Sequence, residues 1–81
     1  MTVKVLYFGR LKELSGTSEE VLEVREGSVI EDLFARCSKA RPELAKFRPS
    51  LVAARNREFA AWSTPLCSGD EVGFLPPVSG G

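Results

Sequence analysis

The sequence contains no histidine and only two cysteines, so it has few of the side chains that bind transition metals. Cys37 and Cys67 lie far apart in the chain and form no CxxC pair, the spacing typical of structural zinc sites. Their number permits one disulfide, but a reducing cytosol and a sufficient hydrophobic core make it unnecessary. We therefore expect no metal site and two free thiols.

An excess of charge and a long apolar run are also absent. Eleven Lys and Arg residues balance eleven Asp and Glu residues, so no net field attracts nucleic acid or an anionic membrane. No apolar segment approaches the roughly 20 residues that span a bilayer, and the residues after Met1 do not resemble a signal peptide. We expect a cytoplasmic protein that binds neither nucleic acid nor membrane and has a specific protein partner.

The overall amino-acid composition is that of an ordinary globular domain. Of the 81 residues, 43% are hydrophobic and 27% are charged, which argues against disorder. This length suits one hydrophobic core and is too short for two. We therefore expect a single domain.

Alternating hydrophobicity predicts a hairpin at the start of the chain. Residues 2–8 form the first predicted strand, with Val3, Val5 and Tyr7 on one face and Lys4, Leu6 and Phe8 on the other. Gly9 ends this strand. A short helical turn over residues 10–14 then leads to a second strand over residues 20–24.

The clearest helix signal begins at Ser28. Glu31 follows three residues later, and the pair reads as a capping box before an apolar stripe. The stripe consists of Val29, Ile30, Leu33, Phe34 and Cys37. The helix should end near Ala40, because Pro42 disfavours helical geometry at Arg41 and can begin a further turn over residues 42–47.

The second half of the chain reads as three short strands. Residues 51–55 and 58–62 are the third and fourth predicted strands, joined by a tight turn at Asn56 and Arg57. A turn over residues 68–70 precedes the last strand, residues 71–75, in which Val72 and Phe74 should face inward. Pro76 and Pro77 then stop the sheet.

This order of elements predicts an α+β protein with the β-grasp (ubiquitin-like) fold, in which one main helix crosses a mixed sheet. The first and last strands should lie side by side and parallel in the centre, because both are apolar runs. We expect residues 1–75 to form the β-grasp domain and residues 76–81 to form an extended tail.

The tail carries the most informative signal. It consists of Pro76, Pro77, Val78, Ser79, Gly80 and Gly81. The prolines stiffen the exit from the sheet and lack backbone donors, and the glycines fit a channel too narrow for any side chain. These features predict a tail that inserts into a partner and presents the carboxylate of Gly81. The residues also permit the interpretation that the Gly-Gly pair is a frayed end or a remnant of processing.

A terminal carboxylate is a poor acyl donor because its leaving group is bad. Adenylation by ATP makes a mixed anhydride that a sulfur nucleophile attacks, and the product is a thiocarboxylate. This chemistry requires no catalytic side chain of the carrier itself. It therefore suits a chain without histidine and without a recognisable catalytic constellation.

Three large apolar residues are predicted on the outside of the sheet. Phe8, Phe59 and Leu75 fall opposite the core positions of their strands. If the first and last strands are neighbours, Phe8 and Leu75 lie where the tail leaves and form an apolar docking patch. A register error of one residue would invert these assignments.

Both ends of the chain resemble one protein family. Residues 68–81, SGDEVGFLPPVSGG, are similar to the end of the small subunit of molybdopterin synthase, the MoaD family of ubiquitin-like sulfur carriers. Residues 5–9, VLYFG, with Glu13 and Gly16, resemble the opening of that family, so the likeness covers essentially the whole chain. Lys12 stands where many relatives carry arginine; it keeps the charge without the bidentate fork, and we assign it a weak partner contact. Arg55 occupies a strand position that is often apolar in relatives.

The resemblance implies a sulfur-transfer function. It implies that Gly81 is adenylated by a MoeB-like adenylyltransferase, which supplies the ATP site, and is then converted to a thiocarboxylate. It further implies that the tail inserts into a MoaE-like large subunit of a heterotetramer. There the sulfur would pass to cyclic pyranopterin monophosphate in molybdenum cofactor biosynthesis. The chain itself would bind no cofactor and have no independent catalytic site.

Other functions remain compatible with the residues. A sulfur carrier for thiamine synthesis or tRNA thiolation would share the Gly-Gly ending, although the Pro-Pro step favours the pterin branch. A ubiquitin-like modifier would instead form an isopeptide bond through Gly81. In a plain interaction module the patch would bind a partner and the tail would be idle. Cys37 and Cys67 are interpreted as packing residues rather than sulfur relays.

Overall fold

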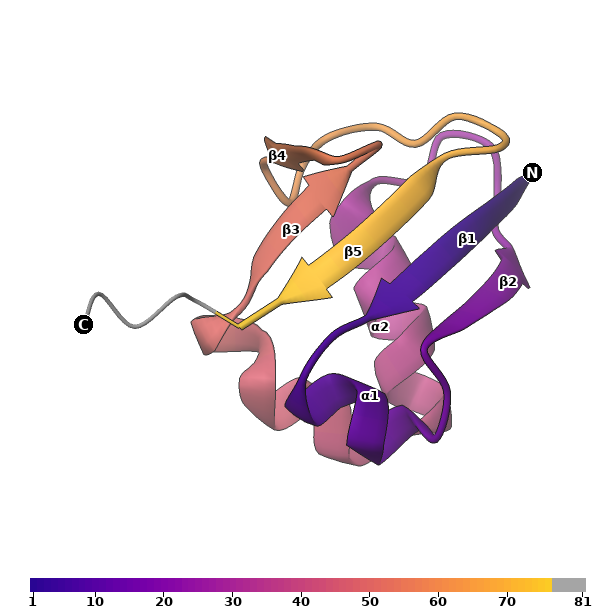
Figure 1. The fold of residues 1–81 in the computed structure, drawn as a ribbon. Helices are drawn as coiled ribbons and strands as arrows, with labels where there is room; N and C mark the ends of the chain where they lie inside the picture. The colour runs from indigo at the N-terminus through magenta and orange to yellow at the C-terminus, as the bar shows by residue number, and fades with distance from the viewer. Residues whose placement is uncertain (77–81) are drawn as a thin grey trace.

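The computed structural model describes residues 1–76, so the tail residues Pro77, Val78, Ser79, Gly80 and Gly81 lie outside the described residues. Within the described part, the elements follow the predicted order (Figure 1). They are β1 (Thr2–Tyr7), α1 (Arg10–Ser15), β2 (Glu19–Glu23), α2 (Ile30–Ala40), the 3-10 helix η1 (Pro42–Ser50), β3 (Val52–Arg55), β4 (Glu58–Ala60) and β5 (Glu71–Leu75).

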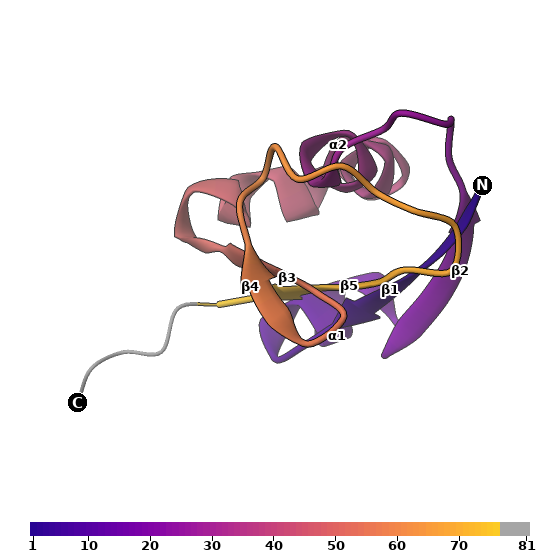
Figure 2. The ribbon, with the colours of Figure 1, turned by 90° about the horizontal axis from the view of Figure 1, so that it is seen from above.

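The five strands form one mixed sheet in the order β2-β1-β5-β3-β4. β1 and β5 are parallel neighbours in its centre, whereas the other pairs are antiparallel. Seen from above, α2 and η1 lie on one side of this sheet (Figure 2). The predicted β-grasp fold of the α+β class is therefore confirmed, including the central parallel pair.

The core lies between α2 and the sheet. Val3, Val5 and Tyr7 of β1 are at most 2% exposed, as the alternation predicted. From β5 and α2 the core receives Val72, Phe74, Ile30, Leu33, Phe34 and Cys37. No helix among residues 1–76 is long and apolar enough to cross a membrane.

An aromatic column closes the core near the end of β5. The rings of Trp62 and Phe74 stack with centroids 5.6 Å apart, and Phe34 meets Phe74 edge-on at 5.0 Å. On the other side, the Arg48 guanidinium carbon lies 3.5 Å from the centre of the Trp62 ring. Arg48 Nε and Nη2 donate to the two carboxylate oxygens of Glu31 at 2.8 and 2.6 Å, which fixes the guanidinium over the ring.

The prediction that α2 begins at Ser28 was wrong. The cap residue is Val29, whose extended backbone pairs with Pro65, and the carbonyl of Ser28 accepts the Leu66 N–H at 2.9 Å. The segment before the helix is thus held extended by a tertiary contact. Asp32, not Glu31, reaches back to the Val29 N–H at 2.9 Å.

Two other boundaries differ from the prediction by two residues or more. η1 continues to Ser50, beyond the predicted end at residue 47, and contains Pro49. β4 ends at Ala60 rather than at residue 62, because Trp62 leaves the strand to stack on the core.

The turn between β3 and β4 is clamped to the start of β5. Asn56 and Arg57 both have positive φ, 50° and 72°, as a tight two-residue hairpin turn requires. The side chain of Asn56 donates to Asp70 Oδ1 at 3.0 Å and accepts the Glu71 N–H at 3.0 Å. Asp70 Oδ2 accepts the Cys67 N–H at 2.7 Å and lies 3.7 Å from Arg55 Nη1.

Asp70 holds these contacts as an ionised, 7% exposed residue. Its burial would raise the pKa of the carboxyl. The Cys67 and Asn56 donors and the Arg55 guanidinium outweigh that effect and lower the pKa below its ordinary value of 3.8. Asp70 therefore stabilises the fold above pH 3.8, and this stabilisation is lost as the pH falls through the lower folded-state pKa.

We expect Asp70→Asn to reduce the free energy of unfolding at pH 7 by about 1–3 kcal/mol, because it removes a charged acceptor and turns an amide donor toward Asn56. In urea denaturation, the difference from wild type should shrink as the pH is lowered below 3.8. Glu26→Gln, at an exposed acid, is the control and should have the stability of wild type at pH 7. A difference that does not change with pH would contradict the role of the ionised carboxylate.

Candidate functional site

The side of the sheet that faces away from α2 carries a row of apolar and small residues. The strand register aligns Leu6 of β1 with Gly73 of β5, Gly73 with Ala54 of β3, and Ala54 with Phe59 of β4. All four alternate with core positions of their strands. They therefore share the face that α2 leaves uncovered.

A second row lies nearer to the end of β5. Leu75 pairs with Val52, and Phe8 follows Tyr7, the partner of Phe74, so that it falls beside Leu75. The predicted outward positions of Phe8, Phe59 and Leu75 are thereby confirmed. Phe8 is 40% and Phe59 79% exposed. We call the two rows the apolar outer face: Leu6, Phe8, Val52, Ala54, Phe59, Gly73 and Leu75.

The centre of the apolar outer face is a hollow of about 210 Å³. Gly73 is buried at its floor beneath Phe8: a Cβ on Gly73 would lie 3.0 Å from Phe8 Cε2. Phe8 and Phe59 both line the hollow. Our sequence reasoning missed Gly73, and the signal was a glycine inside an otherwise apolar strand, which marks a close approach.

A larger apolar groove of about 610 Å³ begins where β5 ends. Its lining consists of Val52, Ala53, Phe59, Ala60, Ala61, Trp62, Leu75 and Pro76. Pro76, the last described residue, also lies against the junction of β1 and α1, since a Cβ on Gly9 would be 3.8 Å from Pro76 Cγ. The base of the predicted tail is thus surrounded by apolar surface. This groove was missed too, although the adjacent small residues Ala60 and Ala61 indicated open space.

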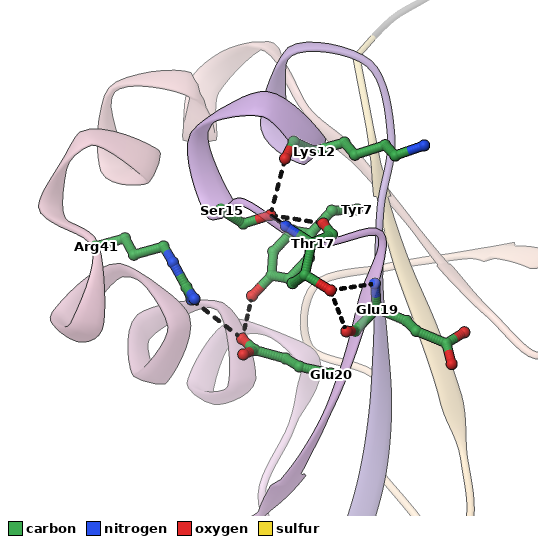
Figure 3. Close-up of polar contacts among 7 residues, drawn as sticks. All are labelled: Tyr7, Lys12, Ser15, Thr17, Glu19, Glu20 and Arg41. Carbon is green, nitrogen blue, oxygen red and sulfur yellow. Dashed lines mark hydrogen bonds and ion pairs between the residues drawn. The ribbon is translucent and has the colours of Figure 1, made fainter.

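Lys12 lies on α1 at the border of the apolar outer face. It shares a shallow depression with Leu6 and Phe8. Ser15, the last residue of α1, donates through Oγ to the Thr17 carbonyl at 2.8 Å, and in the turn that follows Thr17 Oγ1 donates to the Glu19 carbonyl at 2.8 Å. Figure 3 shows the ammonium of Lys12 pointing away from this network, so it is available for contact with a partner.

Polar residues at the same end of the sheet join three elements. Tyr7 of β1 donates to Glu20 Oε1 of β2 at 2.5 Å, and Arg41 after α2 donates to the same oxygen at 3.3 Å (Figure 3). Burial, followed by hydrogen bonds with Cys37 and Glu20, raises the pKa of Tyr7 well above its ordinary value. The phenol therefore stays neutral and acts as a fixed donor, which keeps the end of β1 in position for Phe8.

The structure explains why the charged residue Arg55 occurs at this strand position. It lies on the core side of β3, where it donates to the Pro65 carbonyl at 3.0 Å and faces Asp70. It thus fastens the loop before β5 and is not part of the apolar outer face.

Both cysteines are free thiols, as predicted. Cys37 is 1% exposed within the core, where burial raises the pKa of its thiol. Cys67 is exposed, in the loop before β5.

Comparison with known proteins gives consistent matches along the chain. The ThiS family matches residues 5–81. The molybdopterin synthase sulfur carrier subunit of Chlamydomonas reinhardtii is 39% identical over 83 residues, and the alignment covers all of both chains.

Solved structures are also similar to this chain. The small archaeal modifier protein 1 of Methanosarcina acetivorans is 29% identical, with a TM-score of 0.82 and coverage of 99% of this chain and 96% of the other. A chain from the complex of subunits 1 and 2 of molybdopterin-converting factor from Helicobacter pylori is 26% identical, with a TM-score of 0.72 and full coverage of both.

The two thiols should differ sharply in reactivity. With iodoacetamide, we expect Cys67 to be alkylated in the folded protein and Cys37 only after unfolding, because the reactive thiolate is suppressed by burial. Intact-mass measurement and peptide mapping report the sites. The Cys67→Ser variant should take up no label until denaturant is added. Labelling of Cys37 in the folded variant would contradict the inert, packed thiol.

Proposed function

The chain belongs to the ThiS family, and from this premise we propose that it is the sulfur carrier subunit of a molybdopterin synthase. The observation that carries the proposal is the apolar outer face with the groove beside Pro76. A β-grasp domain that exposes apolar surface around the base of its tail is suited to dock on a partner while the tail enters it. The full-length likeness to a sulfur carrier subunit supports the same function.

We further propose that the carboxyl group of Gly81 carries the sulfur. Attack of the carboxylate on ATP forms an acyl adenylate and releases pyrophosphate; a sulfur nucleophile then displaces AMP and leaves a thiocarboxylate. Two such sulfur transfers to cyclic pyranopterin monophosphate build the dithiolene of molybdopterin, and after each one the Gly81 thiocarboxylate has returned to a carboxylate by hydrolysis. Pro76, Pro77, Val78, Ser79 and Gly80 form the inserting tail in this proposal, and the chain supplies no catalytic side chain.

Two protein partners follow from this chemistry. One is a MoaE-like large subunit, which is supported by the likeness to a chain of the complex of subunits 1 and 2 of molybdopterin-converting factor. The other is a MoeB-like adenylyltransferase that uses ATP. We propose that both act in the cytoplasm, and that the chain and the large subunit form a heterotetramer.

A second candidate is a ubiquitin-like modifier, which is favoured by the likeness to small archaeal modifier protein 1. In that function Gly81 forms an isopeptide bond with lysines of target proteins. The two candidates differ in their products in cells. A carrier gives an intact mass with one oxygen replaced by sulfur, whereas a modifier gives conjugates of higher mass.

Deletion of Gly81 should abolish thiocarboxylate formation and leave the unfolding midpoint unchanged, because the tail contributes chemistry and not core. The measurement is intact-mass spectrometry after incubation with the adenylyltransferase, ATP and a sulfur donor. An uncleavable extension beyond Gly81 should have the same effect, since it replaces the carboxylate with an amide. Sulfur loading or normal sulfur transfer by either variant would contradict the proposal.

Phe8→Glu and Phe59→Glu should each weaken binding to the large subunit by roughly 2 kcal/mol or more, because docking would desolvate the new charge. Isothermal titration calorimetry measures the dissociation constant. Val21→Glu is the matched control: Val21 is 61% exposed on β2, pairs with Lys4 and is separated from the hollow by β1. If all three variants bind alike, the apolar outer face is not the interface.

A further inference from the structure

The hollow of the apolar outer face has a charged rim on one side only. Arg57 and Glu71 line it opposite Phe8 and Leu75. Arg57 Nε is 3.8 Å from Glu71 Oε1, and the Arg57 side chain is 90% exposed. Within residues 1–76, no acceptor lies at hydrogen-bonding distance from the Arg57 guanidinium. Its donors are therefore available to a partner.

The backbone of Arg57 adopts a left-handed conformation, which has a lower conformational free energy for glycine than for arginine. Its φ of 72° lies in the left-handed region, which an L residue rarely adopts. The neighbouring Asn56 clamps the turn, because its N–H donates to the Glu71 carbonyl at 2.7 Å and its side chain binds Asp70. The guanidinium is thus presented from a fixed turn.

The nearby Arg55, by contrast, uses its guanidinium for contacts within the fold. Arg55 donates to Pro65 and pairs with the buried Asp70. Arg57 projects from the same hairpin onto the rim of the hollow, where it pairs only with the partly exposed Glu71, at 3.8 Å, and donates no hydrogen bond within residues 1–76. The two arginines therefore have different functions, and only Arg57 is placed to contact another molecule.

We propose that this hollow is a socket for one large apolar side chain of the large subunit, and that Arg57 pairs with a carboxylate beside that side chain. The inference rests on the proposed function and names the chemistry of its interface. Gly73 and Ala54 make the floor, and Phe8 and Phe59 contribute the aromatic walls. A volume of about 210 Å³ suits a single side chain rather than a helix or strand.

The positive charge of the Arg57 guanidinium indicates that the partner supplies a carboxylate. Insertion of the apolar side chain removes water from the rim, so an ion pair with Arg57 becomes stronger than it would be in open solvent. Glu71 next to Arg57 prevents the rim from being a purely basic surface, which disfavours a polyanion such as nucleic acid. A protein segment with one apolar and one acidic side chain satisfies both parts of the hollow.

The test compares two charge reversals that change the net charge equally. Arg57→Glu should weaken binding of the complete chain to the purified large subunit by about tenfold or more. Arg25→Glu, at an exposed arginine in the loop after β2, should stay within about twofold. Raising the salt concentration should weaken wild-type binding more than that of Arg57→Gln, because the neutral variant has lost the ion pair.

The outcomes separate this inference from the function on which it rests. If wild type binds the large subunit and Arg57→Glu binds as well as Arg25→Glu, the inference is overturned and the proposed function stands. If wild type does not bind the large subunit, both are overturned. A second copy as occupant is tested by light scattering: a wild-type dimer that Arg57→Glu dissociates would overturn the proposal.

Filling the socket is an independent test. Gly73→Ala places a Cβ against Phe8 and should weaken binding by about fivefold or more, with an unchanged circular dichroism spectrum. If Gly73→Ala does not fold, Ala54→Leu fills the hollow from the neighbouring strand and should have the same effect. Wild-type affinity of a folded, filled variant would overturn the socket.

Discussion

The parallel pairing of β1 with β5 is the constraint on which the rest of the molecule depends. It aligns the two chain segments in direction, so both strands end at the same edge of the sheet. Phe8, Gly9, Leu75 and Pro76 meet there although they are distant in sequence. Because parallel strands need a crossover connection, the intervening chain must pass over one face as α2. One pairing thus determines the covered face, the open face and the exit of the tail.

The parts of the fold that sequence reasoning predicted are those governed by local pattern. Alternation in β1 placed Val3, Val5 and Tyr7 in the core, and the same alternation placed Phe8 outside. The turn residues Asn56 and Arg57 located the β3–β4 hairpin. For the candidate site, the pattern was enough to predict Phe8, Phe59 and Leu75 on the outer face, because register follows directly from the buried positions.

The parts that were missed depend on tertiary contacts. Serine is a favoured residue at helix N-caps, but the carbonyl of Ser28 accepts a hydrogen bond from the Leu66 N–H, so the helix begins later. The hollow at Gly73 exists because the Phe8 ring approaches from another strand, and no periodicity within β5 encodes that approach. From the sequence alone Arg57 is a solvated turn residue, and only the folded chain places it at the rim of the hollow.

The stacking of Trp62 between Arg48 and Phe74 has an optical consequence. Trp62 is the only tryptophan in the sequence; it stacks on Phe74 of the core and also lines the groove beside Pro76. Its emission therefore senses both the integrity of the core and the arrival of any molecule in that groove. The unlabelled chain therefore contains an intrinsic fluorophore that contacts both the hydrophobic core and the groove.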